Sequence, residues 1–353
     1  MFKSKIFVMF IVTLLVAGLV LSGCGNSSSS SSQTPATQTE KKDEGQKLVI
    51  KLGIGSALTS QLGEYAVKFK EILESKSNGQ IEVQIFPNGQ MGNDKSMMES
   101  LQMGTLDMTA PSTAPIANFI KDFLYFDLPM LVDDDAAAKK LLTSDLAKET
   151  LKKLDSIGIV GLDYWVNGFR NITNSKRPVK TAADIKGLKI RTMQNPIHID
   201  FFNALGANAT PMAFNEVFNA LEQKVIDGQE NPISLIYTSG FHEVNKYVTL
   251  SRHVFTPYVA MISKKTWEKI TPEQQKLIQE AATEVANQCF DILNAQESKF
   301  LEDMKSKGNV IDELSPEGRT QLQNTAKEIW KKYESEIGKD TMQKVMSIIG
   351  KSY

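Results

Sequence analysis

A continuous stretch of the chain, residues 187–232, constrains the fold more than any other part of the sequence. Residues 188–192 alternate apolar with charged side chains, which predicts a short strand. Pro196 then opens a predicted helix that Gly206 ends, and a second predicted helix follows Pro211. The stretch therefore begins with a strand followed by two helices, as in an α/β protein.

The same stretch closes with a second strand, which begins at residue 225. Residues 228–232 form a polar segment that we expect to turn into a third helix. Arg191 lies near the end of the first strand and Asn231 near the end of the last. Ligands of open α/β sheets bind at this edge, so the pattern predicts a ligand site there.

Strands and helices alternate along most of the remaining chain, from residue 48 onward. The first strand, helix and strand predict a parallel βαβ unit. The strands at 247–251 and 258–262 are expected to pass between two lobes. A long helix is predicted over residues 272–306, with further helical stripes at 322–330 and 342–349. The other elements are predicted strands at 48–54, 81–85, 106–110 and 157–164, and predicted helices at 62–73, 97–103 and 135–154.

The N-terminus has the pattern of a secretory signal. Lys3 and Lys5 precede an apolar run, residues 6–21, and small residues then precede Cys24, as in a bacterial lipobox. We expect residues 1–23 to be a lipoprotein signal peptide and Cys24 to be the lipidated first residue of the mature protein. The alternative is a transmembrane anchor with an incidental cysteine. The Ser- and Thr-rich residues 24–46 are expected to form a flexible low-complexity tether.

Composition excludes several classes of protein. The formal net charge is −1 and no basic stripe is present, so a nucleic-acid partner is not expected. The chain has two cysteines, Cys24 and Cys289. Lipidation of Cys24 would exclude an intramolecular disulfide, and the apolar helical run around Cys289 predicts a buried, inert thiol.

Motifs of catalysis and metal binding are absent from the sequence. The chain has no GxSxG, no P-loop and no GxGxxG after a strand. None of the three histidines, His198, His242 and His253, has metal-ligand spacing with another ligand residue. The acidic run 133–135 is interpreted as a solvated helix N-terminus rather than a cation site. We therefore predict no catalytic residue, no metal and no cofactor.

Several long motifs follow one another along the chain. They are FPNGQMGNDKSMMESLQMGTLDM and NGFRNITNSKRPVKTAADIKG, followed by GLKIR, LGANATPMAFNEVFNAL and VIDGQENP. Together they closely resemble the DctP-like family, the solute-binding proteins of tripartite ATP-independent periplasmic (TRAP) transporters. The resemblance covers nearly all of residues 48–305, in family order and spacing. It departs from the family at Ala209, where proline is frequent.

The resemblance implies a two-lobed α/β fold of the periplasmic-binding-protein type, type II-like, with hinge strands and a long bracing helix. Lobe I is expected to contain residues 47–167 and about 258–297. Lobe II is expected to contain residues 168–257 and about 298–353. One small ligand would bind between the two lobes.

The resemblance also assigns roles to residues of lobe II. Arg191 matches the arginine that grips the substrate carboxylate, and a guanidinium offers the planar two-donor fork that this requires. The alternative is a surface arginine, or one in a salt bridge to Asp200 or Asp227. Arg170 matches a second cleft arginine, and its alternative is a loop arginine beside Asn171.

Two further residues of lobe II match family positions in the cleft. Asn231 matches an asparagine that can both donate and accept hydrogen bonds; it could also serve as a turn or helix cap. Phe214 matches an aromatic residue that packs on the ligand, and the alternative is core packing with Phe218.

Candidates in lobe I rest on position alone. Ser56, Ser112 and Gln90 lie in or beside expected strand-to-helix turns, where hydroxyl and backbone donors can meet a ligand. Trp165 could supply an apolar wall. An ordinary structural role is the alternative for each of these four residues.

The function implied by the resemblance is that of an extracytoplasmic solute-binding subunit, lipid-anchored to the cell membrane. It would capture a small organic acid and deliver it to a membrane permease of one small and one large subunit, without catalysis. One alternative is an extracellular sensor subunit that presents its ligand to a signalling receptor. A hydrolase or lyase on a related scaffold is another. The sequence leaves open whether the acid is a C4-dicarboxylate, a uronic or aldonic acid, a 2-oxo acid or another carboxylate.

Overall fold

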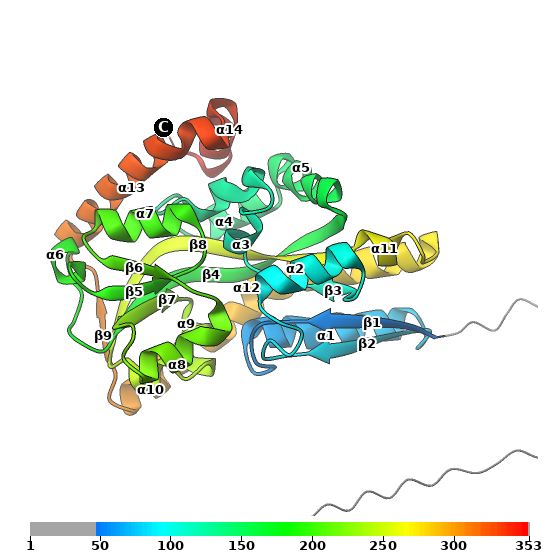
Figure 1. The fold of residues 1–353 in the computed structure, drawn as a ribbon, viewed down its shortest axis with the longest axis horizontal. Coiled ribbons are helices and arrows are strands. Elements are labelled where there is room, and N and C mark those ends of the chain that lie inside the picture. The colour runs from blue at the N-terminus through cyan, green and yellow to red at the C-terminus, as the bar shows by residue number, and fades with distance from the viewer. Residues whose placement is uncertain (1–46, 352–353) are drawn as a thin grey trace, which may run out of the picture. The chain divides into compact units, whose positions relative to one another are not determined.

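Residues 47–351 of the protein are described by a computed structural model (Figure 1). The predicted signal peptide, the tether and Cys24 lie outside these described residues. Between residues 47 and 351, no helix combines the length and the apolar character that crossing a membrane requires.

The described chain forms one mixed sheet flanked by helices, which confirms the predicted α/β class (Figure 1). Nine strands pair in the order β2-β1-β3-β8-β4-β7-β5-β6, and β9 pairs with β8. The strands are β1 (Leu48–Gly53), β2 (Ile81–Phe86), β3 (Met108–Thr109), β4 (Ile159–Asn174), β5 (Lys189–Thr192), β6 (Asn208–Pro211), β7 (Gly228–Asn231), β8 (Tyr247–Ser263) and β9 (Val310–Glu313). β1 and β2 are parallel, as the predicted βαβ unit requires.

Two long strands, β4 and β8, join the two lobes. They pair antiparallel along almost their whole length, from Ile159 opposite Ser263 to Asn174 opposite Tyr247. One end of this pair continues into β3, β1 and β2, and the other end continues into β7, β5 and β6. A register shift adjoins Gly168, whose φ of +112° is one that residues with a side chain rarely adopt. The predicted hinge strands are therefore present, and 247–251 and 258–262 are parts of one strand, β8.

Helices pack against this sheet in both lobes (Figure 1). The shorter helical segments are α3 (Thr113–Ile116), α6 (Ala182–Ile185), α8 (Val217–Glu222), α9 (Ile233–Thr238), α10 (Phe241–Val244), α11 (Lys264–Trp267), and the 3₁₀ segments η1 (Lys121–Asp127), η2 (Leu154–Ile157) and η3 (Phe214–Glu216). The longer helices are α1 (Gln61–Lys76), α2 (Asp94–Met103), α4 (Asp135–Leu142), α5 (Asp145–Lys153), α7 (Pro196–Ala204), α12 (Pro272–Ser306), α13 (Pro316–Ile337) and α14 (Lys339–Ile349).

The longest helix, α12, has the bounds that its periodicity predicted, 272–306. A capping box starts it: the Thr271 side chain accepts from the backbone of Gln274, and the Gln274 side chain accepts from the backbone of Thr271. The helix packs on α1 and β4 of one lobe and on α9 of the other. Its 35 residues span on the order of 50 Å, so α12 braces both lobes.

A buried aromatic cluster fastens α12 to lobe I. The indole N–H of Trp165 donates to the carbonyl of Ala282 at 3.0 Å, and the hydroxyl of Tyr65 donates to the carbonyl of Cys289 at 3.0 Å. Phe69 packs beside Trp165, and all three aromatic side chains are fully buried. Burial also raises the pKa of the Cys289 thiol to about 12, which confirms the expected inert cysteine.

The helix predicted over residues 135–154 is two helices, α4 and α5. The helix breaks because the Ser144 hydroxyl accepts a hydrogen bond from the backbone of Ala147 and caps a new helix. Asp134 caps α4 by accepting from the backbone of Ala137, so the acidic run is the helix N-terminus that was predicted.

The polar turn expected over residues 228–232 is wrong, because residues 228–231 form the buried strand β7. Its polar side chains find partners within the sheet: Gln229 donates to Thr173, and Glu230 accepts from Arg170. A strand can therefore lie in the interior here without apolar side chains.

The C-terminal helices lie against segments of the first half of the chain. α13 packs on α7 and η1, and α14 packs on α4. The Trp330 indole donates to the carbonyl of Pro129 at 2.7 Å, and Lys351 pairs with Asp133 at 2.8 Å. The tail, which was predicted to belong to lobe II, therefore also contacts residues that were predicted to belong to lobe I.

The position of Trp165 under α12 gives a prediction about stability. Replacing Trp165 by alanine removes a fully buried ring and its hydrogen bond, and should lower the free energy of unfolding by about 3–5 kcal/mol. Trp267→Ala is the matched control, since this ring is only partly buried; it should cost clearly less. Urea unfolding measures both variants, and equal losses would contradict the central place of Trp165 in the core.

Candidate ligand-binding site

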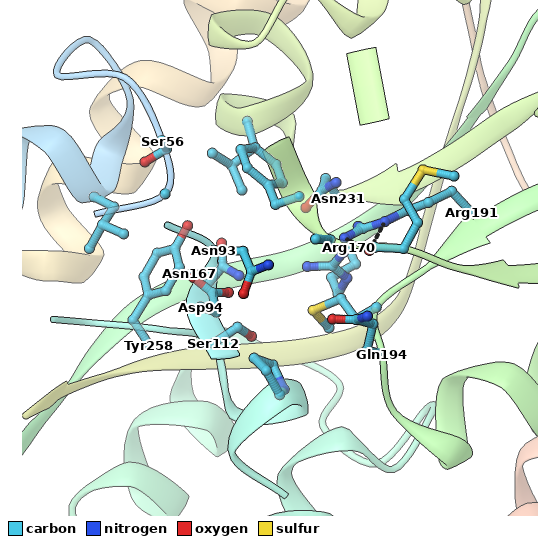
Figure 2. Close-up of a pocket in the computed structure, with 18 residues that line it drawn as sticks. Ser56, Asn93, Asp94, Ser112, Asn167, Arg170, Arg191, Gln194, Asn231 and Tyr258 are labelled. Atoms are coloured by element: carbon cyan, nitrogen blue, oxygen red, sulfur yellow. Dashed lines mark hydrogen bonds between the residues drawn. The ribbon is translucent and has the colours of Figure 1, made fainter. Parts of the chain in front are cut away.

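A cavity lies between the two lobes, beside the hinge strands β4 and β8 (Figure 2). Its volume of about 50 Å³ is several times the roughly 10–15 Å³ that one enclosed water molecule needs. Side chains from both ends of the sheet line it. They are Gly55, Ser56, Leu62, Asn93, Asp94, Ser112, Pro115, Asn167, Arg170, Arg191, Met193, Gln194, Met212, Ala213, Phe214, Asn231, Leu235 and Tyr258.

Arg191 reaches this cavity from β5, where it is 3% exposed. Its Nε and Nη2 donate to the carbonyl of Met212 at 3.0 and 2.7 Å. Its buried Nη1 makes no hydrogen bond to any atom of residues 47–351. The surface-arginine interpretation is wrong. The proposed partners are also engaged elsewhere, since Asp200 pairs with Lys332 and Asp227 with Lys176.

Burial also shapes the electrostatics of Arg191. Removal from water lowers the pKa of Arg191 from its usual 12.5 to about 10, and the nearby charge of Arg170 acts in the same direction. A pKa of about 10 still leaves the guanidinium charged at neutral pH. Arg191 is thus a buried cation with a free N–H donor in the cavity.

Arg170 lies on β4, not in a loop, and belongs to a buried network. Its Nε and Nη2 donate to the two carboxylate oxygens of Glu230 at 2.5 and 2.9 Å. His253 Nε2 lies 3.2 Å from the same carboxylate, and its Nδ1 lies 2.8 Å from the Ser251 hydroxyl. Burial alone would raise the pKa of Glu230, but the charge of Arg170 and the hydrogen bond from His253 hold that pKa well below its usual range.

This pairing orients Arg170. Two of its three guanidinium nitrogens face Glu230, and within residues 47–351 no hydrogen bond engages Nη1. Figure 2 shows the guanidinium groups of Arg170 and Arg191 close together at one end of the cavity.

Asn231 and Phe214 complete the lobe II wall. Asn231 is buried at the end of β7, and its Nδ2 donates to the Gln229 side chain at 2.5 Å. Phe214 packs edge-on against Phe241, with ring centroids 5.8 Å apart, so it contacts the lobe II core as well as lining the cavity.

The opposite wall comes from lobe I and includes two of the predicted residues. Ser56 is buried and its hydroxyl lies 2.7 Å from that of Ser60. Ser112 is buried before α3, and its hydroxyl has no partner among the described residues. Gln90 does not line the cavity. Trp165 does not either, because it is enclosed under α12; Tyr258 supplies the aromatic wall instead.

Several lining residues were not predicted from the sequence. Asn93 and Asp94, which start α2, Asn167 on β4, Gln194 after β5 and Tyr258 on β8 all reach the cavity. Asn93 and Asp94 lie inside the FPNGQMGND motif and Asn167 begins the NGFRNITNSK motif, so a signal existed for these three residues. Gln194 and Tyr258 come from a connecting segment and a strand interior, which carry no pattern that marks a cavity.

Asp94 is the one carboxylate among the residues that line the cavity. Burial raises the pKa of Asp94 from 3.8 to about 6, although the charge of Arg191 opposes this shift. Burial also raises the pKa of the Tyr258 hydroxyl, so that group stays protonated and can donate.

The arrangement suits binding of a small anion with polar substituents. Free guanidinium donors lie at one end, while hydroxyl, amide and carboxylate groups line the rest. None of the three histidines, nor Cys289, lines this cavity.

Comparisons with known proteins agree with this geometry. A family model described as "Bacterial extracellular solute-binding protein, family 7" (DctP) matches residues 53–336. The C4-dicarboxylate-binding periplasmic protein DctP of Rhodobacter capsulatus is 33% identical over 300 residues, which cover 84% of this chain and 90% of that protein.

Two solved structures are similar over most of their length. The sugar acid binding protein DctPAm from Advenella mimigardefordensis, in complex with galactonate, is 39% identical with a TM-score of 0.84; the match covers 86% of this chain and 97% of that one. A TRAP periplasmic solute binding protein from Polaromonas sp. JS666, bound to D-erythronate, is 32% identical with a TM-score of 0.82, covering 87% and 99%.

The family match, residues 53–336, includes the strands β4, β5, β7 and β8 that carry the cavity. They confirm the resemblance and the fold that it implied. The chain therefore belongs to family 7 of the bacterial extracellular solute-binding proteins, the DctP-type solute-binding components of TRAP transporters.

Proposed function

We propose that the protein captures a small organic acid between its lobes and delivers it to a TRAP membrane permease. The observation that carries the proposal is the buried guanidinium of Arg191, whose Nη1 has no partner among the described residues. A buried, unpaired donor on a cation has a high desolvation cost, which a ligand carboxylate would offset. The acids bound by the relatives, galactonate and D-erythronate among them, support this class of ligand.

The other lining residues receive roles that follow from their chemistry. Arg170, fixed by Glu230, would direct its free Nη1 to the same carboxylate. Asn231 would accept or donate at the ligand's polar groups, and Phe214 would pack on its carbon chain. From lobe I, Ser112 and Ser56 would supply hydroxyl groups when the lobes close.

Binding without chemical conversion is part of the proposal. No histidine or cysteine lines the cavity, and the relatives are solute-binding proteins. Incubation with each bound acid should return that acid unchanged, as judged by chromatography.

Lobe closure follows from a site that both lobes share. We propose lobe I as residues 47–167 with about 258–297, and lobe II as residues 168–257 with about 298–353, moving about β4 and β8. A saturating organic acid should lower the radius of gyration in small-angle scattering, because hinge closure makes the molecule more compact. An identical scattering profile at saturation would count against closure.

The lipid anchor is proposed from the sequence. Small residues before Cys24 match a lipobox, so Cys24 would carry the lipid that holds the protein at the outer face of the cell membrane. Cys24→Ser should release the protein from the membrane fraction or block its processing, as seen by fractionation and intact mass. Normal cleavage with unchanged membrane retention would contradict the lipoprotein proposal, whereas Cys289→Ser should leave anchoring unaffected.

The role of Arg191 can be tested by calorimetry with galactonate and D-erythronate. Arg191→Ala should weaken binding by roughly 2–5 kcal/mol, because the ligand carboxylate would be buried without its countercharge. This loss corresponds to about 30- to several-thousand-fold in Kd. Arg191→Lys should recover little, since an ammonium cannot reproduce the planar fork.

Arg319→Ala on α13 is the matched control, because that arginine lies outside the cavity. It should bind like the unaltered protein. Near-native affinity of Arg191→Ala, or a neutral sugar as the tightest ligand, would overturn the carboxylate assignment.

A further inference from the structure

The cavity lining also contains a carboxylate, that of Asp94, which has no part in the proposed capture of a ligand carboxylate. Asp94 is the first residue of α2 and follows the N-cap Asn93, whose side chain accepts from the backbone of Ser96. Figure 2 shows the Asp94 carboxylate among Asn93, Asn167 and Ser112, on the lobe I side of the cavity. Within residues 47–351 it forms no hydrogen bond and no ion pair.

Asp94 faces a cavity whose positive charge is at the other end. Arg170 is already paired with Glu230 through Nε and Nη2, so Arg191 is the lining cation that has no carboxylate partner among the described residues. The charge of Arg191 acts to lower the pKa of Asp94, and the charge of Asp94 acts to raise the pKa of Arg191. The two side chains nevertheless form no ion pair within 4.0 Å. A ligand whose carboxylate contacts Arg191 would therefore extend toward Asp94 with its other substituents.

The chemistry of a carboxylate decides what those substituents can be. An ionised carboxylate only accepts hydrogen bonds, so it favours ligand hydroxyls, which donate. A second ligand carboxylate would meet a like charge in a site with little water, which is unfavourable. Burial of Asp94 makes an uncompensated second anion there still more costly.

The groups around Asp94 agree with a hydroxylated ligand. The hydroxyl of Ser112 is buried and has no partner among the described residues. The Asn167 amide and the Tyr258 hydroxyl add further polar groups on the same side. Such mixed donors and acceptors complement a row of hydroxyls better than they complement a second carboxylate, which cannot donate.

We infer that Asp94 is a specificity residue that makes the site prefer hydroxylated monocarboxylates, of the sugar-acid class, over dicarboxylates of the same length. This inference rests on the proposed capture of an acid by Arg191 and names which acids would be captured. Asp94 would accept from hydroxyls at the end of the ligand remote from its carboxylate.

Two matched pairs of ligands test the inference. D-Erythronate and meso-tartrate form one pair, and D-galactonate and galactarate form the other. The two acids of each pair differ only in whether the last carbon is an alcohol or a carboxylate. Calorimetry at neutral pH should show that the monocarboxylate of a pair binds at least tenfold more tightly. Asp94→Asn, which keeps the shape and removes the charge, should reduce that preference at least tenfold, with weaker monocarboxylate and stronger dicarboxylate binding.

Asp145→Asn is the control, because Asp145 also lies in the first turn of a helix, α5, but outside the cavity. It should keep the full preference. Tighter binding of the dicarboxylate to the unaltered protein, or a preference that Asp94→Asn changes less than twofold, would overturn the inference. Circular dichroism of each variant verifies that it folds.

The same titrations separate this inference from the proposed function. If Arg191→Ala abolishes binding of every acid while Asp94→Asn leaves the preference intact, the capture of acids stands and the role of Asp94 fails. If none of the four acids binds, or if Arg191→Ala binds them normally, the proposed function fails and the inference fails with it.

Discussion

The buried ion pair between Arg170 and Glu230 is the interaction on which the site depends. It joins β4 to β7 in the interior, where an unpaired charge of either sign would be strongly destabilising. His253 on β8 extends the network to a third strand. Because Glu230 engages two guanidinium nitrogens, Arg170 keeps a single orientation beside Arg191. The Arg170–Glu230 pair therefore both joins two strands of the sheet and orients a side chain of the ligand site.

The two buried arginines of the site differ in how the protein compensates their charges. Arg170 has its countercharge in the protein, whereas Arg191 hydrogen-bonds, within residues 47–351, only to the carbonyl of Met212. A protein that leaves a buried cation incompletely paired sacrifices stability in its ligand-free form. A ligand carboxylate that pairs with Arg191 can then restore part of this stability. The affinity for the ligand therefore depends on how unfavourable the buried Arg191 charge is in the ligand-free protein.

How much of this could be predicted from the sequence depended on whether a segment follows a periodic pattern. The bounds of α12 followed from apolar spacing and from Pro272 after a capping threonine. β7 was misread as a turn, since its buried polar residues are stabilised by partners distant in sequence, such as Arg170. Asp94 was missed because an acid in a first helical turn has an ordinary electrostatic explanation. Trp165 was misplaced, since local sequence does not tell which face of a two-sided buried strand meets a cavity.

The crossing strands have a consequence for how the chain acquires its structure. Residues near 260 lie between β3 and β4, so the sheet of lobe I lacks an internal strand until β8 has been added. Neither lobe corresponds to a continuous piece of chain that could be cut out and fold by itself. Such distant pairings make folding slow and strongly cooperative. A fragment that ends before β8 would thus lack the strand that β3 and β4 both pair with.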